Sequence, residues 1–188
     1  MKTDSAVVQG STFLVTDTDG RTTRDHNGLY HQDTRHLNEY DLEIAGTTLE
    51  PLNVHAPRPS ERVVHLATSL ANGARTLYVS RRQLVTNGLY ERLHIQNLTT
   101  EPRTETISLQ FEAAFEDLFE IRSHTEGHER TVDTEPHPNG IIFRYNPDDI
   151  NHEWATTVNA SDGDITVTNE TNNAAAKLEL ELSLAPRE

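Results

Sequence analysis

Apolar and polar residues alternate along most of this chain with a period of two. The clearest run is residues 106–115, TISLQFEAAF, in which every second residue from Ile107 to Phe115 is apolar. Residues 177–184, KLELELSL, and residues 91–98, ERLHIQNL, repeat the pattern. Such alternation is typical of antiparallel β-strands that place one face on a core and the other in water. The sequence therefore predicts half-buried strands.

Shorter patterned runs and turn signals extend this prediction along the chain. Additional strands are predicted at residues 11–16, 39–45, 61–68, 75–86, 139–145, 152–160 and 164–168. Turn signals separate them at TDG 18–20, ANG 71–73, TNG 86–88, PNG 138–140 and SDG 161–163. Asn-Gly and Asp-Gly pairs tolerate the positive φ angles that tight hairpins require. Residues 75–98 therefore predict one long hairpin that turns at Asn87-Gly88.

Helix is scarce, and the strands predict the fold class. Only residues 115–122, FEDLFEIR, are compatible with a turn or two of helix, and they can equally end the preceding strand. Residues 123–138, SHTEGHERTVDTEPHP, are polar without any period and predict an exposed loop. Ten to twelve one-sided strands bury their apolar faces best as two packed antiparallel sheets. We therefore expect residues 1–188 to form a single all-β domain, a two-sheet antiparallel β-sandwich.

Charge is the strongest signal in the composition. The chain has 30 Asp and Glu residues against 16 Lys and Arg, a formal net charge of −14. This charge disfavours nucleic acid and anionic membranes as partners. Concentrated salt screens repulsion between carboxylates, so the composition predicts a folded protein adapted to high salt. There is no cysteine, no secretory signal and no apolar run of ~20 residues, which predicts a cytoplasmic protein.

Most motifs that would carry chemistry are absent or incomplete. DTDG at 17–20 does not fit a calcium-binding loop, because the frame that its glycine sets puts Val15 and His26 at ligand positions. His124 and His128 have a helical ligand spacing, but Gly127 between them argues against a helix. No nucleophile elbow, phosphate-binding loop or dinucleotide fingerprint occurs. We therefore expect no catalytic residue, no metal and no cofactor in this chain.

One polar cluster stands out in residues 28–44, GLYHQDTRHLNEYDLEI. Asp33, Arg35 and His36 lie between a turn at Asn27-Gly28 and a strand that starts near Glu39. Arg35 can pair with a carboxylate, for which Asp33 and Asp117 are candidates. The cluster is either an ionic clip that anchors a loop or a polar rim that contacts a sugar or a neighbouring domain. Catalysis by His36 is disfavoured because the sequence indicates no nucleophile beside it. Glycoside hydrolysis would need two catalytic carboxyl groups at a defined separation, and Glu112, Glu116, Asp117 and Glu120 are the acids from which they could come.

Three stretches resemble the N-terminal domain of glycogen-debranching-type, amylo-α-1,6-glucosidase-like enzymes. They are residues 11–52, residues 81–102 and residues 111–123. The most specific pieces are Gly28-Leu29 with Asp33-Thr34-Arg35, and Asp117-Leu118-Phe119-Glu120. The resemblance implies a large β-sandwich, of the supersandwich type, that precedes a C-terminal (α/α)6 catalytic domain in the same parent chain. It also implies that the catalytic carboxylates lie on that second domain and that α-glucan is the substrate.

The resemblance makes an ancillary, non-catalytic domain the leading hypothesis for this chain. Six residues are then candidates for the substrate rim or the contact between domains: Asp33, Arg35, His36, Asp117, Glu120 and Arg122. A stand-alone carbohydrate-binding module is the first alternative, and its aromatic platforms would come from Tyr30, Tyr78, Tyr90 and Trp154. A structural or assembly protein that pairs through its edge strands is the second, although charged strand faces disfavour such pairing.

Overall fold

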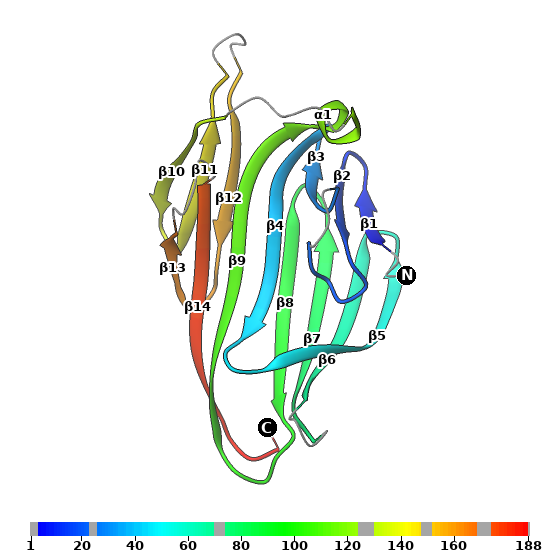
Figure 1. The fold of residues 1–188 in the computed structure, drawn as a ribbon, viewed down its shortest axis with the longest axis vertical. Coiled ribbons are helices and arrows are strands. Elements are labelled where there is room, and N and C mark those ends of the chain that lie inside the picture. Colours follow the sequence, from blue (N-terminus) through cyan, green and yellow to red (C-terminus); the bar gives the residue numbers. More distant parts are fainter. Residues whose placement is uncertain are drawn as a thin grey trace.

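The computed structural model describes residues 4–22, 26–69, 74–123, 130–147, 152–168 and 174–187. Within these ranges the chain forms fourteen strands and one short helix (Figure 1). The elements are β1 Ser5–Gln9, β2 Thr12–Thr16, β3 Gly28–His31, β4 Thr34–Ile44, β5 Thr48–Arg58, β6 Glu61–Ser69, β7 Arg75–Val85, β8 Leu89–Asn97, β9 Arg103–Asp117, α1 Leu118–Ser123, β10 Val132–His137, β11 Gly140–Tyr145, β12 Trp154–Asn159, β13 Asp164–Val167 and β14 Ala174–Leu184. No helix among the described residues is long and apolar enough to cross a membrane.

The strands form three antiparallel sheets. The largest has seven strands in the order β1-β2-β3-β4-β9-β14-β13, and the others have the orders β5-β6-β7-β8 and β10-β11-β12. In Figure 1 the three-stranded sheet lies on the side of β14, and the four-stranded sheet lies on the side of β1 to β3. Apolar side chains from all three sheets meet in one core cluster, which includes Leu42, Phe111, Val79 and Phe143. The all-β sandwich is confirmed, but three sheets replace the two expected.

The alternation in the sequence corresponds to the two faces of the strands. In β9 the residues Ile107, Leu109 and Phe111 are buried, as the pattern predicts. In β14 the leucines at 178, 180, 182 and 184 are half-buried, while Glu179 and Glu181 are exposed. The predicted hairpin of residues 75–98 is present as β7 and β8, joined by Thr86, Asn87 and Gly88. The stretch 115–122 is divided: Phe115 to Asp117 end β9, and the short helix α1 begins at Leu118.

Several local predictions are wrong. Residues 132–137 of the expected loop 123–138 form β10, which pairs along its whole length with β11; residues 124–129 lie outside the described residues. Gly28 begins β3 and is not a turn, and the following strand starts at Thr34, well before Glu39. Neither β10 nor the first residues of β4 show the apolar alternation on which the prediction depended. Backbone pairing with β11 and with β9, respectively, holds these segments in place.

The longest strands bring the candidate residues together. β4 and β9 pair in the middle of the seven-stranded sheet, and their register joins Thr34 to Asp117 and Arg35 to Glu116. The hairpin between β3 and β4 and the helix α1 therefore lie at the same end of the molecule (Figure 1). This end holds the polar cluster predicted from the sequence.

Candidate functional site

The hairpin between β3 and β4 places Asp33 in a tight turn. Gln32 and Asp33 form its two-residue loop, with φ angles of 48° and 64°. Aspartate tolerates this left-handed conformation better than most residues. The Asp33 carbonyl accepts a hydrogen bond from Leu118 N at 2.9 Å, which ties the turn to the start of α1. The exposed Asp33 carboxylate pairs with none of the described residues.

Arg35 is buried and pairs with a carboxylate that the sequence did not indicate. Its Nε donates to Glu116 Oε2 at 2.7 Å, and Nη2 contacts the same oxygen. Its Nη1 donates to the Asn27 carbonyl at 3.1 Å. The expected partners Asp33 and Asp117 are both wrong, because the register of β4 and β9 puts Glu116 directly opposite Arg35.

Irregular pairing between β4 and β9 shapes this region. The register shifts between Arg35 and Leu37 and again between Leu37 and Glu39. Phe115 lies at the first shift with φ 51° while only 3% of it is exposed. A bulky residue in this conformation is an outlier that costs about 1–3 kcal/mol and requires support from its surroundings. At this bulge the Phe115 ring contacts His36, and Glu116 is paired with Arg35 across the strands.

His36 belongs to a line of rings that crosses from the large sheet to the three-stranded sheet. We call this line the aromatic row; it contains His31, His36, Phe115, Tyr145, Trp154 and His152. Successive ring centroids are 6.0, 5.4, 6.0, 6.1 and 4.6 Å apart. His36 Nδ1 is 2.8 Å from Thr156 Oγ1 of β12. The row therefore links β3, β4 and β9 to β11 and β12.

Burial and, to a lesser extent, neighbouring His31 together lower the pKa of His36 to about 4. A neutral imidazole at neutral pH can form a hydrogen bond with the Thr156 hydroxyl and contact the Phe115 ring edge to face. It cannot serve as a cation for an anionic ligand. His36 is thus suited to packing and hydrogen bonding, and its side-chain partner is the Thr156 hydroxyl.

Acidification is expected to destabilise the fold through His36 by about 2 kcal/mol between pH ~7 and pH ~4. An unfolded histidine takes up its proton near pH 6.5, whereas folded His36 does so only near pH 4. Between these values the unfolded chain holds more protons, so the free energy of unfolding falls as the pH falls. Urea unfolding of the wild type and of His36→Gln across this range tests the prediction. The difference between the two should depend on pH, and a constant difference would contradict the assignment.

Asp117 and Glu120 cap the helix α1. Phe119 N donates to Asp117 Oδ1 at 2.7 Å, and Asp117 N donates to Glu120 Oε2 at 2.8 Å. This reciprocal arrangement is a capping box, which satisfies two backbone donors at a helix start. Glu120 also pairs with Arg130, whose guanidinium lies 5.7 Å from the centroid of the Tyr145 ring. Both acids therefore have structural partners.

Arg122 differs from the other five candidates. It lies exposed in the last turn of α1 and makes no ion pair or hydrogen bond with a described residue. Phe119 on the same helix is 72% exposed. The structure thus brings Asp33, Arg35, His36, Asp117 and Glu120 to one end of the sandwich and leaves Arg122 and Phe119 open to contact.

Arg35→Ala is expected to lower the free energy of unfolding by about 2 kcal/mol, because it leaves Glu116 without its partner in a partly buried position. The Arg35 side chain is 8% exposed and that of Glu116 is 27% exposed, so water offsets part of the loss. Denaturant unfolding measures the effect. Arg122→Ala is the matched control and should change stability by less than about 0.5 kcal/mol. Equal effects of the two changes would show that the Arg35–Glu116 pair is not stabilising.

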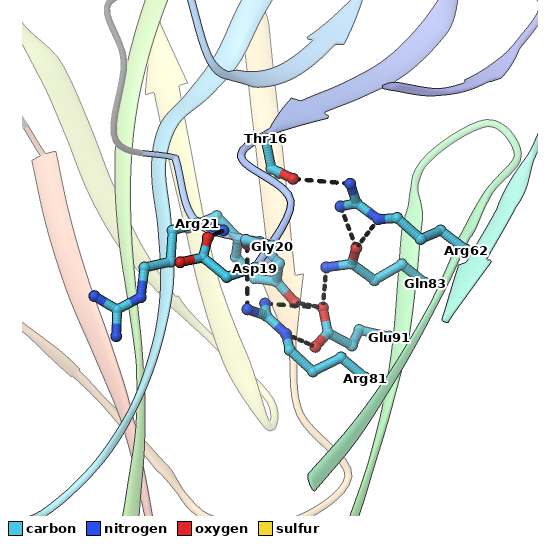
Figure 2. Close-up of polar contacts among 9 residues, drawn as sticks. Thr16, Asp19, Gly20, Arg21, Arg62, Arg81, Gln83 and Glu91 are labelled. Atoms are coloured by element: carbon cyan, nitrogen blue, oxygen red, sulfur yellow. Dashed lines mark hydrogen bonds and ion pairs between the residues drawn. The ribbon is translucent and has the colours of Figure 1, made fainter. Parts of the chain in front are cut away.

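A second polar cluster lies between the large sheet and the four-stranded sheet, and sequence analysis missed it. Figure 2 shows Arg62, Arg81, Gln83 and Glu91 projecting from β6, β7 and β8 toward the segment after β2. Arg81 Nε donates to Glu91 Oε1 at 2.7 Å, and Gln83 Nε2 donates to Glu91 Oε2 at 2.7 Å. Arg62 Nε donates to Gln83 Oε1 at 3.0 Å, which completes a chain of four side chains. We call these four residues the buried network.

The buried network is closed by groups from the large sheet. Tyr40 donates its hydroxyl to Glu91 Oε2 at 2.6 Å, and Arg81 Nη1 donates to the Gly20 carbonyl at 3.2 Å (Figure 2). Burial alone would raise the pKa of Glu91, but Arg81 and the hydrogen bonds from Arg81, Tyr40 and Gln83 hold that pKa below its usual value. Burial lowers the pKa of Arg62 to about 10. The network therefore holds an ionised pair in the interior.

The remaining sequence candidates have structural positions or lie outside the described residues. Tyr30 is buried and stacks on Phe13 at 4.6 Å, and Trp154 is half-buried in the aromatic row. Asp17 to Gly20 form a turn, in which Gly20 N donates to the Asp17 carbonyl at 3.0 Å. His124 and His128 are outside the described residues. Among the residues that the structure describes, no group of three or more metal-ligating side chains occurs.

Comparison with known protein families identifies the family of this chain. A sequence model of a family described as the N-terminal domain of (some) glycogen debranching enzymes matches residues 7–188. No curated protein matches the chain significantly.

Proposed function

Since the chain belongs to the family of N-terminal domains of glycogen debranching enzymes, we propose that it is the non-catalytic ancillary domain of an α-glucan glycoside hydrolase. The resemblance found in the sequence is thereby confirmed at the level of the family. In this proposal residues 1–188 form one β-sandwich module that supports an (α/α)6 catalytic domain of the same parent chain. The module also helps to shape the entrance for substrate.

One observation carries the proposal of a non-catalytic role. Three acids at this end of the sandwich have structural partners: Glu116 binds Arg35, while Asp117 and Glu120 cap α1. A glycosidase needs two carboxyl groups that face a sugar, one of them with a raised pKa. These three acids are arranged for stability, which supports a scaffold that leaves catalysis to another domain.

The end of the sandwich that carries α1 is the part we assign to the substrate entrance. Phe119 and Arg122 are exposed there, next to the aromatic row that holds His36 and Trp154. Exposed aromatic and arginine side chains are enriched where proteins contact partners. A sugar chain or the rim of a catalytic domain would find both apolar and charged groups at this position.

The intact mass of the native gene product in its source cells tests the proposal. A product several-fold larger than 21.2 kDa is expected, with residues 1–188 at its N-terminal side. Release of glucose from a branched maltooligosaccharide should then require the larger product and not this chain alone. A native product of 21.2 kDa, or hydrolysis by the isolated chain, would contradict the proposal.

A stand-alone carbohydrate-binding module is the second candidate, and Trp154 is the observation in its favour. Its ring is half-buried, and it lies beside His152 and Tyr145 in the aromatic row. Such rings can stack on the apolar face of a sugar. If the chain binds α-glucan by itself, Trp154→Ala should weaken retention on immobilised glycogen, and unchanged retention would count against this role.

We also propose that the chain is adapted to concentrated salt. The outer side of the central strands carries Glu39, Asp41, Glu43 and Glu112 close together. Burial raises the pKa of Glu39, and repulsion from Asp41, Glu112 and Glu43 raises it further. Carboxylates of this density repel one another in dilute buffer. A cytoplasmic location fits this composition and stays a prediction.

Salt is expected to stabilise the chain. Raising potassium chloride from about 0.1 M to about 2 M shortens the screening length to a few ångströms. Because each like-charge pair costs up to ~1 kcal/mol, the free energy of unfolding should rise by about 1–3 kcal/mol. Urea unfolding at both salt concentrations provides the measurement. Glu39→Gln should reduce the difference between the two values. Equal stability in low and high salt would contradict salt adaptation.

A further inference from the structure

The outer face of the four-stranded sheet differs in composition from the rest of the molecule. The register of β5 to β8 aligns its side chains in rows, such as His55, Val63, Arg82 and Arg92. We call this surface the arginine–histidine face. Its charged and aromatic members are Arg58, Arg82, Arg92, His55, His65, His94, Tyr78, Tyr90, Glu50 and Glu61.

Rings on this face contact one another across all four strands. The centroids of His55 and His65 are 5.4 Å apart, those of His65 and Tyr78 are 5.9 Å apart, and those of Tyr78 and His94 are 6.5 Å apart. His65 Nδ1 also lies 2.5 Å from the Tyr78 hydroxyl. These contacts form a continuous ladder of rings. Nearby Tyr90 is 59% exposed and Leu84 is 37% exposed, so the face combines apolar and polar surface.

The face carries excess positive charge on an acidic molecule. It holds three arginines against two glutamates, whereas the whole chain has a formal net charge of −14. Glu61 is bound to Arg82, whose Nε donates to Glu61 Oε1 at 2.6 Å. Arg92 lies directly opposite Arg82 and makes no ion pair or hydrogen bond with a described residue. Like charges directly opposite destabilise a sheet, so this pair favours an acidic group from outside.

The C-terminal segment is fastened beside this sheet. Asn97 at the end of β8 donates its Nδ2 to the Ala185 carbonyl at 3.0 Å. Arg187 N donates to the Thr99 carbonyl at 3.1 Å, and Figure 1 shows this end of the chain next to the connection between β8 and β9. A domain that follows in a longer chain would therefore start next to β8.

We propose that the arginine–histidine face docks an acidic surface of the catalytic domain that follows in the parent chain. The inference rests on the proposed function and adds the surface and its chemistry. The excess arginine charge supplies the electrostatic complement, and the ladder of rings with Tyr90 supplies apolar contact area. Aromatic and arginine side chains are enriched at protein interfaces for these two reasons.

Histidine labelling with diethylpyrocarbonate tests this docking. His55 and His94 are exposed on the face, and His137 in β10 is exposed elsewhere as the matched control. Labelling is measured by mass spectrometry on the 188-residue chain and on the native gene product. We expect the labelling rates of His55 and His94 to fall several-fold in the native product, with that of His137 unchanged. Equal rates in both samples, or equal protection of all three histidines, would overturn the inference.

The failure of the inference is distinguishable from that of the proposed function. A native product of 21.2 kDa refutes both, whereas a larger product with reactive His94 refutes only the docking surface. Arg92→Glu in the larger product should restore the labelling of His94. Lys177→Glu, on the outer side of the large sheet, should not. In the 188-residue chain Arg92→Glu should not lower the unfolding midpoint, because it removes the charge repulsion between Arg92 and the directly opposite Arg82.

Discussion

Replacement of Glu91 by alanine is expected to lower the free energy of unfolding by about 3–5 kcal/mol, the usual cost of leaving a buried charge without its partner. Glu91 and Arg81 have side chains that are 6% and 1% exposed, so water cannot replace the lost carboxylate. The same change removes the acceptor for the Tyr40 hydroxyl and for Gln83 Nε2. For a chain of this size we expect the melting temperature to fall by about 10 °C.

Denaturant unfolding of Glu91→Ala against the wild type measures this loss. Arg144→Ala is the matched control, since it breaks ion pairs with Glu135 and Glu153 that are largely exposed. Exposed pairs contribute about 0–1 kcal/mol, so the control should have little effect. A loss for Glu91→Ala no larger than that of the control would mean that the buried network is not a source of stability.

The network explains why two arginines occupy the core of an acidic protein. Arg62 and Arg81 lie on the inner side of β6 and β7, where Val64 and Val79 contribute to the hydrophobic core. Replacing such a network by apolar residues is often neutral or stabilising, whereas removing one member is not. We infer that the benefit of the network is a unique packing of the two sheets. The series of hydrogen bonds from Arg62 through Gln83 and Glu91 to Tyr40 forms only when the sheets meet in one register.

The strand pattern could be predicted from the sequence where one face of a strand is buried. β9 and β14 alternate, and their positions were predicted correctly. β5 and β10 did not give this signal, because both are mostly exposed and both contain proline. Edge strands accept proline and need no apolar face, so backbone pairing places them. For the same reason the number of sheets could not be derived, since alternation does not show which strands pair.

The candidate site was predicted in part. Arg35 was identified as a pairing residue, but its partner depends on the bulge at Phe115, and a φ of 51° in a phenylalanine has no sequence signal. The buried network did leave a signal. Arg81 and Gln83 have the same phase in β7 as the buried Val79 and Val85. Polar residues in the inward phase of a predicted hairpin indicate a buried hydrogen-bond network.

Gly28→Ala is expected to cost about 3–5 kcal/mol, the sum of a strained backbone and an overlap in a packed region. Gly28 has φ 146°, a conformation that favours glycine. A Cβ atom at this position would lie 2.3 Å from the Leu37 carbonyl oxygen and 2.8 Å from Arg35 Cδ. The first neighbour is backbone of the paired strand β4, which cannot move without disturbing the β4–β9 register.

The consequence should reach the candidate site. The overlap pushes on the aliphatic part of Arg35, whose guanidinium holds Glu116 and the Asn27 carbonyl. Loss of this anchor would loosen the end of the sandwich that carries α1. We therefore expect Gly28→Ala to lower stability more than Arg35→Ala does, since it disturbs both the strand pairing and the ion pair.

Gly46→Ala separates the two parts of this cost. Gly46 has φ 71°, and a Cβ atom there would have no neighbour within 4 Å. The control therefore retains backbone strain without overlap, and it should lose about 1 kcal/mol. Urea unfolding of both variants gives the comparison. Equal losses would show that the approach of Leu37 and Arg35 to Gly28 is not limiting, and that the hairpin tolerates a side chain. A much larger loss for Gly28→Ala would show that a glycine is required where β3 passes Arg35.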